Sequence, residues 1–229
     1  MSKEKQKHGD GFEQIEEVTI STEQFIEKNQ NLIIKIVIAA IVVIGIVLGY
    51  HKFYKQPLAK EAMNKMFAAE NLFEKDSFNL ALKGNGSNIV GFLDIIEEYG
   101  STPSGNLAKY YAGLCYLYTG DYNNAIKYLE KFSSDDMIFN SLAKSNIGDA
   151  YMQLGDYKKA ADYYKKASSE DTNELTAPII LMKAGLAFEK ANDYKAALSM
   201  YEKIEKEFVR SMEGRDIEKY ITRVKQNIK

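Results

Sequence analysis

Cysteine and histidine are scarce in this sequence of 229 residues, and their scarcity excludes several kinds of chemistry. The single cysteine, Cys115, cannot form an internal disulfide, and the two histidines, His8 and His51, lie outside the region that we expect to fold as a domain. Zinc sites built from cysteine and histidine, Cys-His nucleophiles and Ser-His-Asp triads are therefore excluded from that region. We predict no catalytic residue, no metal site and no cofactor.

An excess of charge of one sign is also lacking. Lys and Arg number 30 against 32 Asp and Glu, which gives a formal net charge of −2, whereas proteins that bind nucleic acid gather positive charge on one face. Carboxylates that are adjacent in sequence, such as those of Asp135 and Asp136, point in different directions on a helix and indicate solvated surface. Because no convergent set of acid, base and nucleophile is visible, we expect neither nucleic-acid binding nor enzyme activity.

What the sequence does contain is a motif that occurs three times. In residues 147–167, Gly148 is followed by an aromatic residue, a Gly-Asp pair, an alanine and a second aromatic residue. The same frame begins again at Gly113 and at Gly185. The matching positions are Gly113, Tyr116, Gly120, Asp121, Tyr122, Ala125, Leu129 and Phe132; Gly148, Tyr151, Gly155, Asp156, Tyr157, Ala160, Tyr164 and Ala167; and Gly185, Phe188, Asn192, Asp193, Tyr194, Ala197, Tyr201 and Ile204.

Each position of this motif has a physical cause. A glycine inside a helix, such as Gly148, costs about 1 kcal/mol relative to alanine, so we expect it to let a second helix approach, with Ala160 as the matching small residue. Gly155 suits the left-handed residue that ends the first helix, and Asp156 suits the N-cap of the second. Cys115 stands where the other copies have alanine, so we interpret it as core packing.

The motif resembles the tetratricopeptide repeat, in which a pair of antiparallel helices forms each unit. The resemblance covers residues 106–211 and implies an all-α fold, a tetratricopeptide-repeat α-solenoid of three stacked repeats. Residues 58–105 resemble a degenerate repeat that caps the N-terminal end, with helices predicted over 58–82 and 89–99. An amphipathic helix within residues 212–229 is the expected C-terminal cap.

A long apolar run precedes the repeats. Residues 32–50 are apolar except for Lys35, and at 1.5 Å per residue a helix of this length crosses a hydrocarbon core of about 30 Å. We therefore predict one N-terminal transmembrane helix over residues 32–50, a break at Pro57, and a partly disordered tail over residues 1–31. Within that tail, Ser21 and Gln24 have the form of a capping box that would start a helix.

Two glycines in the predicted span, Gly45 and Gly49, have the spacing that lets transmembrane helices pair closely. Such pairing would give a homodimer or a contact with another membrane protein. The alternative is that these glycines have no such role, because glycine is common in spanning helices.

In tetratricopeptide repeat proteins the first helices of successive repeats line a concave groove, and the resemblance assigns positions of this chain to that groove. These positions form a largely apolar wall, which either accepts an apolar segment of another protein or is filled by the chain's own ends or a second copy. A clamp for C-terminal carboxylates is not expected, since only Asn146 and Lys183 match its pattern. The groove positions are Leu107, Tyr110, Leu114, Leu117 and Tyr118; Leu142, Ser145, Asp149, Met152 and Gln153; and Ile179, Met182, Leu186, Glu189 and Lys190.

A tail, one span and a repeat domain of this length together resemble the ancillary Sec-translocon subunits of bacterial inner membranes. The resemblance implies a cytoplasmic N-terminus, a repeat domain on the envelope side, and translocon subunits, periplasmic chaperones or nascent chains as partners. Lys52, Lys55, Lys60 and Lys65 follow the span, however, and the positive-inside rule would then place the repeats in the cytoplasm. The alternative function is a structural adaptor of an envelope assembly or cell-division complex, or a cytoplasm-facing scaffold.

Overall fold

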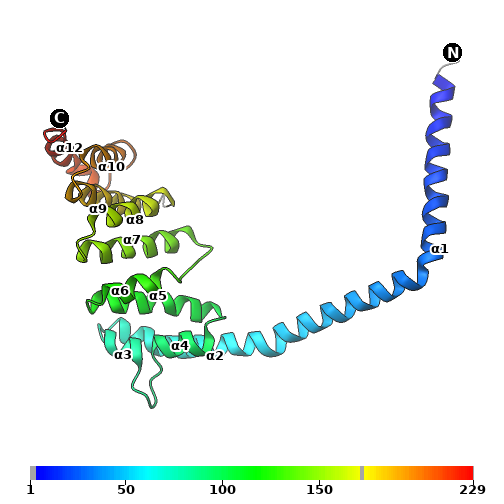
Figure 1. The fold of residues 1–229 in the computed structure, drawn as a ribbon, viewed down its shortest axis with the longest axis horizontal. Helices are drawn as coiled ribbons and strands as arrows, with labels where there is room; N and C mark the ends of the chain where they lie inside the picture. Colours follow the sequence, from blue (N-terminus) through cyan, green and yellow to red (C-terminus); the bar gives the residue numbers. More distant parts are fainter. Residues whose placement is uncertain (1–3, 171–172, 229) are drawn as a thin grey trace. The chain divides into compact units, whose positions relative to one another are not determined.

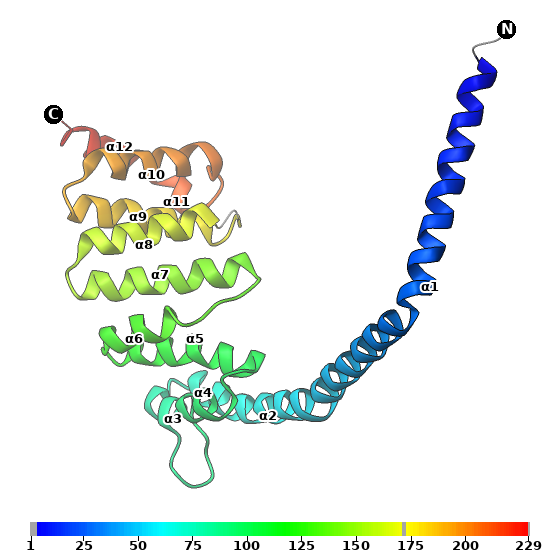
Figure 2. The ribbon, with the colours of Figure 1, turned by 45° about the vertical axis from the view of Figure 1, so that its right-hand side comes forward.

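The computed structural model describes residues 4–170 and 173–228, and every regular element in these residues is helical. The chain divides into two compact units, Met1–Pro57 and Leu58–Lys229, which we describe separately. In the second unit, paired helices follow one another as successive layers (Figure 1). The same layers are seen from another side in Figure 2.

The first unit consists of α1 (Glu4–Tyr50) and the π-helical turn η1 (His51–Lys55). By length and composition, the chain has one helix among the described residues that could cross a membrane, and none of its most apolar window is buried within the structure. Helix α1 begins before the predicted start at Ser21, so residues 4–20, for which we expected no regular structure, are helical. The straight-chain Glu, Gln and Lys residues of this segment are good helix formers, which accounts for the difference.

The predicted break at Pro57 is replaced by a wider turn of helix. Helix α2 (Gln56–Phe73) already includes Pro57, and the amide of Gln56 donates to the carbonyl of His51, five residues earlier. Proline has no N–H to donate, and in a regular α-helix its ring clashes with the carbonyl four residues before it. A π-turn widens the helix at that point, so the chain passes through the proline in helical form.

The second unit opens with α2, α3 (Phe78–Lys83) and α4 (Phe92–Tyr99). The single helix predicted over residues 58–82 is divided because the chain turns at Asp76, which has a left-handed φ of 56°. One side of α2 packs on α4 and α5 in a buried cluster that includes Ala62, Met66 and Phe92. The N-terminal helices thereby cover the exposed end of the first repeat.

Three helical hairpins follow: α5 (Pro103–Tyr118) with α6 (Tyr122–Leu129), α7 (Met137–Gln153) with α8 (Tyr157–Glu170), and α9 (Ala177–Lys190) with α10 (Tyr194–Glu207). Their connecting turns are as predicted.

Left-handed residues end the first helices, with φ values of 83° at Gly120, 78° at Gly155 and 62° at Asn192. The following aspartate caps the second helix; the Asp193 side chain, for example, accepts a hydrogen bond from the amide of Ala196.

The glycine in each first helix is a notch for a large side chain of the second helix. A Cβ atom added to Gly148 would lie 2.6 Å from the ring of Tyr164, and one added to Gly113 would lie 2.5 Å from Leu129. Gly185 stands in the same relation to Tyr201, which is fully buried. Close helix approach is therefore confirmed, although the side chain that enters the notch is this large residue and not the predicted Ala160.

The C-terminal cap is formed by α11 (Met212–Arg215) and α12 (Ile217–Lys225), so the single helix predicted here is divided at Asp216. Helix α11 begins at an N-cap, where the side chain of Ser211 accepts a hydrogen bond from the amide of Gly214. Ile217 and Val224 of α12 are buried in the same cluster as Tyr201. The last helix thus closes the apolar face that the third repeat would otherwise expose.

We predict that Gly148→Ala lowers the free energy of unfolding of the full chain in mild detergent. Overpacking against the Tyr164 ring costs about 1–3 kcal/mol, which exceeds the gain in helix propensity of about 1 kcal/mol. Urea denaturation followed by tyrosine fluorescence measures the change. The control is Gly120→Asn, at a left-handed position with open space around the added Cβ. If the Gly148→Ala protein were as stable as the control, the close packing of Tyr164 against Gly148 would be contradicted.

Candidate partner-binding groove

The predicted groove positions lie on the first helices α5, α7 and α9, and polar contacts connect each of these helices to the next. The amide nitrogen of Asn146 donates to the hydroxyl of Tyr110 at 3.3 Å. The ammonium of Lys183 donates to both carboxylate oxygens of Asp149, at 2.9 and 2.8 Å. Because neighbouring first helices are joined in this way, Asn146, Asp149 and Lys183 already have partners inside the protein.

The last contact of this series connects α9 to the C-terminal cap. Arg223 on α12 donates to the two carboxylate oxygens of Glu189, at 2.6 and 3.1 Å. Arg223 follows Glu189 by 34 residues, as Lys183 follows Asp149 by 34 residues. The sequence reasoning missed Arg223 because it lies outside the three repeats, yet this acid–base spacing of one repeat is a signal that could have found it.

Two buried tyrosines also donate hydrogen bonds to the carboxylates of Asp149 and Glu189. The hydroxyl of Tyr164 donates to Asp149 at 2.6 Å, and that of Tyr201 donates to Glu189 at 2.5 Å. Burial, reinforced by the nearby carboxylate, raises the pKa of both tyrosines far above the ordinary value. Both hydroxyls therefore stay protonated at neutral pH and serve as fixed donors that hold the carboxylates in place.

Two groove positions of the first repeat, Tyr110 and Leu114, are closed in the structure, whereas Tyr118 of the same repeat is 58% exposed. Tyr110 and Leu114 are each only 8% exposed, which at these two positions favours the alternative in which the chain itself fills the groove. The ring of Tyr110 lies 5.2 Å from that of Phe132 and 6.2 Å from that of Phe139, and Phe73 of α2 packs against the same cluster. These three aromatic residues come from segments outside the groove positions, and their contacts account for the burial of this part of the first repeat.

The third-repeat part is open. Ile179 and Leu186 are 42% and 38% exposed, and Met182 between them is partly buried. These residues are spaced by three and four along α9 and so form one stripe, which we call the α9 stripe. The other predicted apolar positions, Leu107, Leu117, Leu142 and Met152, are half-buried.

A hollow of about 540 Å³ adjoins the end of the α9 stripe. Four predicted groove residues, Met152, Leu186, Glu189 and Lys190, contribute to its wall, which joins the groove to the first residue of α10 and to α12. The remaining lining residues are Tyr194, Arg223 and Asn227. The open part of the groove therefore continues up to the C-terminal cap.

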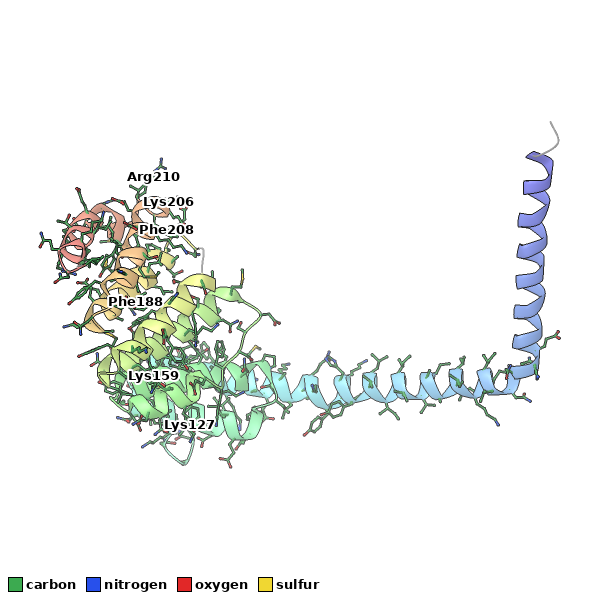
Figure 3. All side chains as sticks on the ribbon, turned by 45° about the horizontal axis from the view of Figure 1, so that its top comes forward. Lys127, Lys159, Phe188, Lys206, Phe208 and Arg210 are labelled. Carbon is green, nitrogen blue, oxygen red and sulfur yellow. The ribbon has the colours of Figure 1, made fainter. Side chains whose placement is uncertain are left out.

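The second helices present a different surface. The ammonium of Lys159 lies 5.1 Å from the centre of the Tyr151 ring, and that of Lys127 lies 5.8 Å from the Tyr128 ring. Lys206, Phe208 and Arg210 gather at the end of α10, apart from Lys127 and Lys159 (Figure 3). Lys127 and Lys159 are held by tyrosine rings of their own repeats. The α9 stripe is therefore the better candidate for a partner-binding surface.

Other kinds of site find little support in the described part of the chain. No group of three or more His, Cys, Asp or Glu residues there could hold a metal ion. Cys115 is fully buried, as expected for core packing, and burial raises its pKa to about 12, so its thiol is protonated and unreactive at neutral pH. Asn146 and Lys183, the two matches to a carboxylate clamp, are engaged by Tyr110 and Asp149.

Comparison with known families decides the nature of this helical array. Two family models described as tetratricopeptide repeat match residues 107–135 and 180–211, and residues 141–171, respectively. The chain contains tetratricopeptide repeats. The three matches coincide with the three hairpins, so the fold is an all-helical tetratricopeptide-repeat solenoid and the repeat domain is a module for protein–protein interaction.

A solved structure has a similar tetratricopeptide-repeat arrangement. It is a variant of a Podosopora anserina protein described as a kinesin light chain with nearly identical TPR-like repeats. The match has 12% sequence identity and a TM-score of 0.50, and it covers 77% of this chain and 87% of the other. At this identity the likeness supports the fold alone. No curated protein matches the sequence significantly.

We predict that Asp149→Ala lowers the free energy of unfolding by about 1–3 kcal/mol, because it leaves the Tyr164 hydroxyl without its acceptor as well as breaking the bond to Lys183. Lys183→Met removes only a partly exposed ion pair and should cost about 0–1 kcal/mol. Urea denaturation of both variants measures the difference. Equal losses in the two variants would show that the tyrosine contact contributes nothing.

Proposed function

We propose that this protein is a membrane-anchored tetratricopeptide-repeat module that binds an apolar segment of a partner polypeptide and so assists protein translocation or chaperone networks at the bacterial inner membrane. The observation that carries the binding proposal is the α9 stripe, Ile179, Met182 and Leu186. We assign the chain no reaction.

The stripe favours an apolar partner because the two carboxylates of the groove, Asp149 and Glu189, already have partners inside the protein. Asp149 binds Lys183 and Tyr164, and Glu189 binds Arg223 and Tyr201. A segment that enters the groove therefore needs to offer apolar side chains, and each apolar Å² that it removes from water contributes about 25 cal/mol. An amphipathic helix whose apolar residues are spaced by three and four would match the stripe.

The membrane part of the proposal rests on residues 32–50 of α1. A Cβ atom added to Gly45 or Gly49 would meet nothing within 4 Å, so these two glycines leave a shallow face that another helix could approach. We propose that this face pairs with a second copy of the chain or with a spanning helix of the partner complex.

The resemblance to ancillary Sec-translocon subunits supports an envelope-side repeat domain, with translocon subunits, periplasmic chaperones or nascent chains as partners. The second candidate function is a structural adaptor or scaffold that faces the cytoplasm. Lys52, Lys55, Lys60 and Lys65, which follow the span, favour this alternative through the positive-inside rule.

The groove is tested by placing a photo-crosslinking residue at Leu186 in native membranes. We expect adducts with translocon subunits or secreted chains from Leu186, and none from the control position Met212, which is 81% exposed but lies outside the groove. Leu186→Lys should weaken partner binding at least about tenfold, since it places a charge against an apolar segment. Binding that survives Leu186→Lys with the fold intact would refute the groove as the site.

The orientation is tested by fusing a reporter that is active only in the cytoplasm to Lys229. We expect no reporter activity in a bacterial host, because the repeat domain should lie on the envelope side. The matched control carries the same reporter at the N-terminus and should be active. A strong signal from the Lys229 fusion would favour the cytoplasm-facing scaffold.

A further inference from the structure

Aromatic side chains gather immediately after the apolar run of α1. Tyr50, Phe53 and Tyr54 are 52%, 78% and 57% exposed, and the rings of Tyr50 and Tyr54 stack with their centres 5.2 Å apart. Lys52 and Lys55 lie in the same segment. None of the three belongs to a buried hydrophobic cluster of the described residues.

The backbone of this segment is unsuited to the hydrocarbon core. Residues 51–55 form the π-turn, in which the amide of Gln56 donates to the carbonyl of His51, and Pro57 directly after it has no N–H to donate to any carbonyl. The segment therefore has one backbone donor fewer than a regular helix, which is costly in hydrocarbon, where water cannot replace the missing bond. The turn is therefore suited to a layer that contains water.

The length of the apolar run places this turn at the membrane boundary. Residues 32–50 rise by about 28 Å at 1.5 Å per residue, close to the roughly 30 Å of a hydrocarbon core. Tyr50 would then stand at one edge of the core and Lys55 just outside it. Tyrosine rings prefer this interfacial position, and lysines attract anionic lipid headgroups.

We propose that residues 50–55 form an interfacial collar that binds the lipid headgroup layer through Tyr50, Phe53 and Tyr54, with Lys52 and Lys55 directed to lipid phosphates. The proposal rests on the membrane span proposed above. The collar sets the depth of the span, and it places the first residues of α2 outside the hydrocarbon.

The chain contains no tryptophan, so a single tryptophan can report its own depth. We would compare three variants of the full chain in phosphatidylcholine vesicles whose acyl chains carry bromine either near the headgroup or near the bilayer centre. Phe53→Trp reports on the collar, and Ile41→Trp reports on the middle of the span. Phe67→Trp, at an exposed position of α2, reports on the chain beyond the collar.

For Phe53→Trp we expect a loss of roughly half the tryptophan emission with bromine near the headgroup, and little loss with bromine at the centre. Ile41→Trp should show the reverse, and Phe67→Trp should be quenched by neither lipid. A Phe53→Trp emission that neither lipid quenches, while that of Ile41→Trp is quenched, would overturn the collar and leave the span intact. Quenching of Phe67→Trp would overturn the collar as the boundary, and an unquenched Ile41→Trp would overturn the span itself.

Discussion

The structure depends on the fit of one large side chain into the glycine notch of its own hairpin. Tyr164 fills the notch at Gly148, and Tyr201 fills the notch at Gly185. This fit brings each tyrosine hydroxyl to a carboxylate on the first helix. That carboxylate then binds a cation on the next helix of the stack, which is Lys183 on α9 for Asp149 and Arg223 on α12 for Glu189. Packing within a repeat is thus coupled to the contacts between repeats. The glycine sets the position of the tyrosine, and the tyrosine hydroxyl in turn holds the carboxylate that forms the ion pair.

The first repeat shows what changes when the notch is filled differently. Leu129 occupies the notch at Gly113 and has no hydroxyl, and the link to the next first helix is the neutral bond from Asn146 to Tyr110. Here aromatic side chains bury Tyr110, whereas in the third repeat Ile179 and Leu186 of the α9 stripe stay exposed. The repeats therefore differ both in the link between their first helices and in the burial of their groove positions.

The features that the sequence predicted correctly are those set by local chemistry. Left-handed Gly120, Gly155 and Asn192 and the aspartate caps that follow them depend only on neighbouring residues, so their spacing alone identifies the hairpins. The burial of Tyr110 could not be predicted in this way, because Phe139 reaches it from a segment that the motif does not include. The same limit applies to Pro57, where the wider turn of helix before it changes the effect expected from its ring.

The central claim is that the hairpins form one stack held by the notches and by the bridges between first helices. Hydrogen exchange of the full chain in detergent, resolved by peptide, tests it most directly. The account predicts that the amides of α7, α8, α9 and α10 are the most protected and exchange together, with faster exchange in α11 and in residues 84–91. Independent exchange of α9 and α10 from α7 and α8, at much lower protection, would contradict the account.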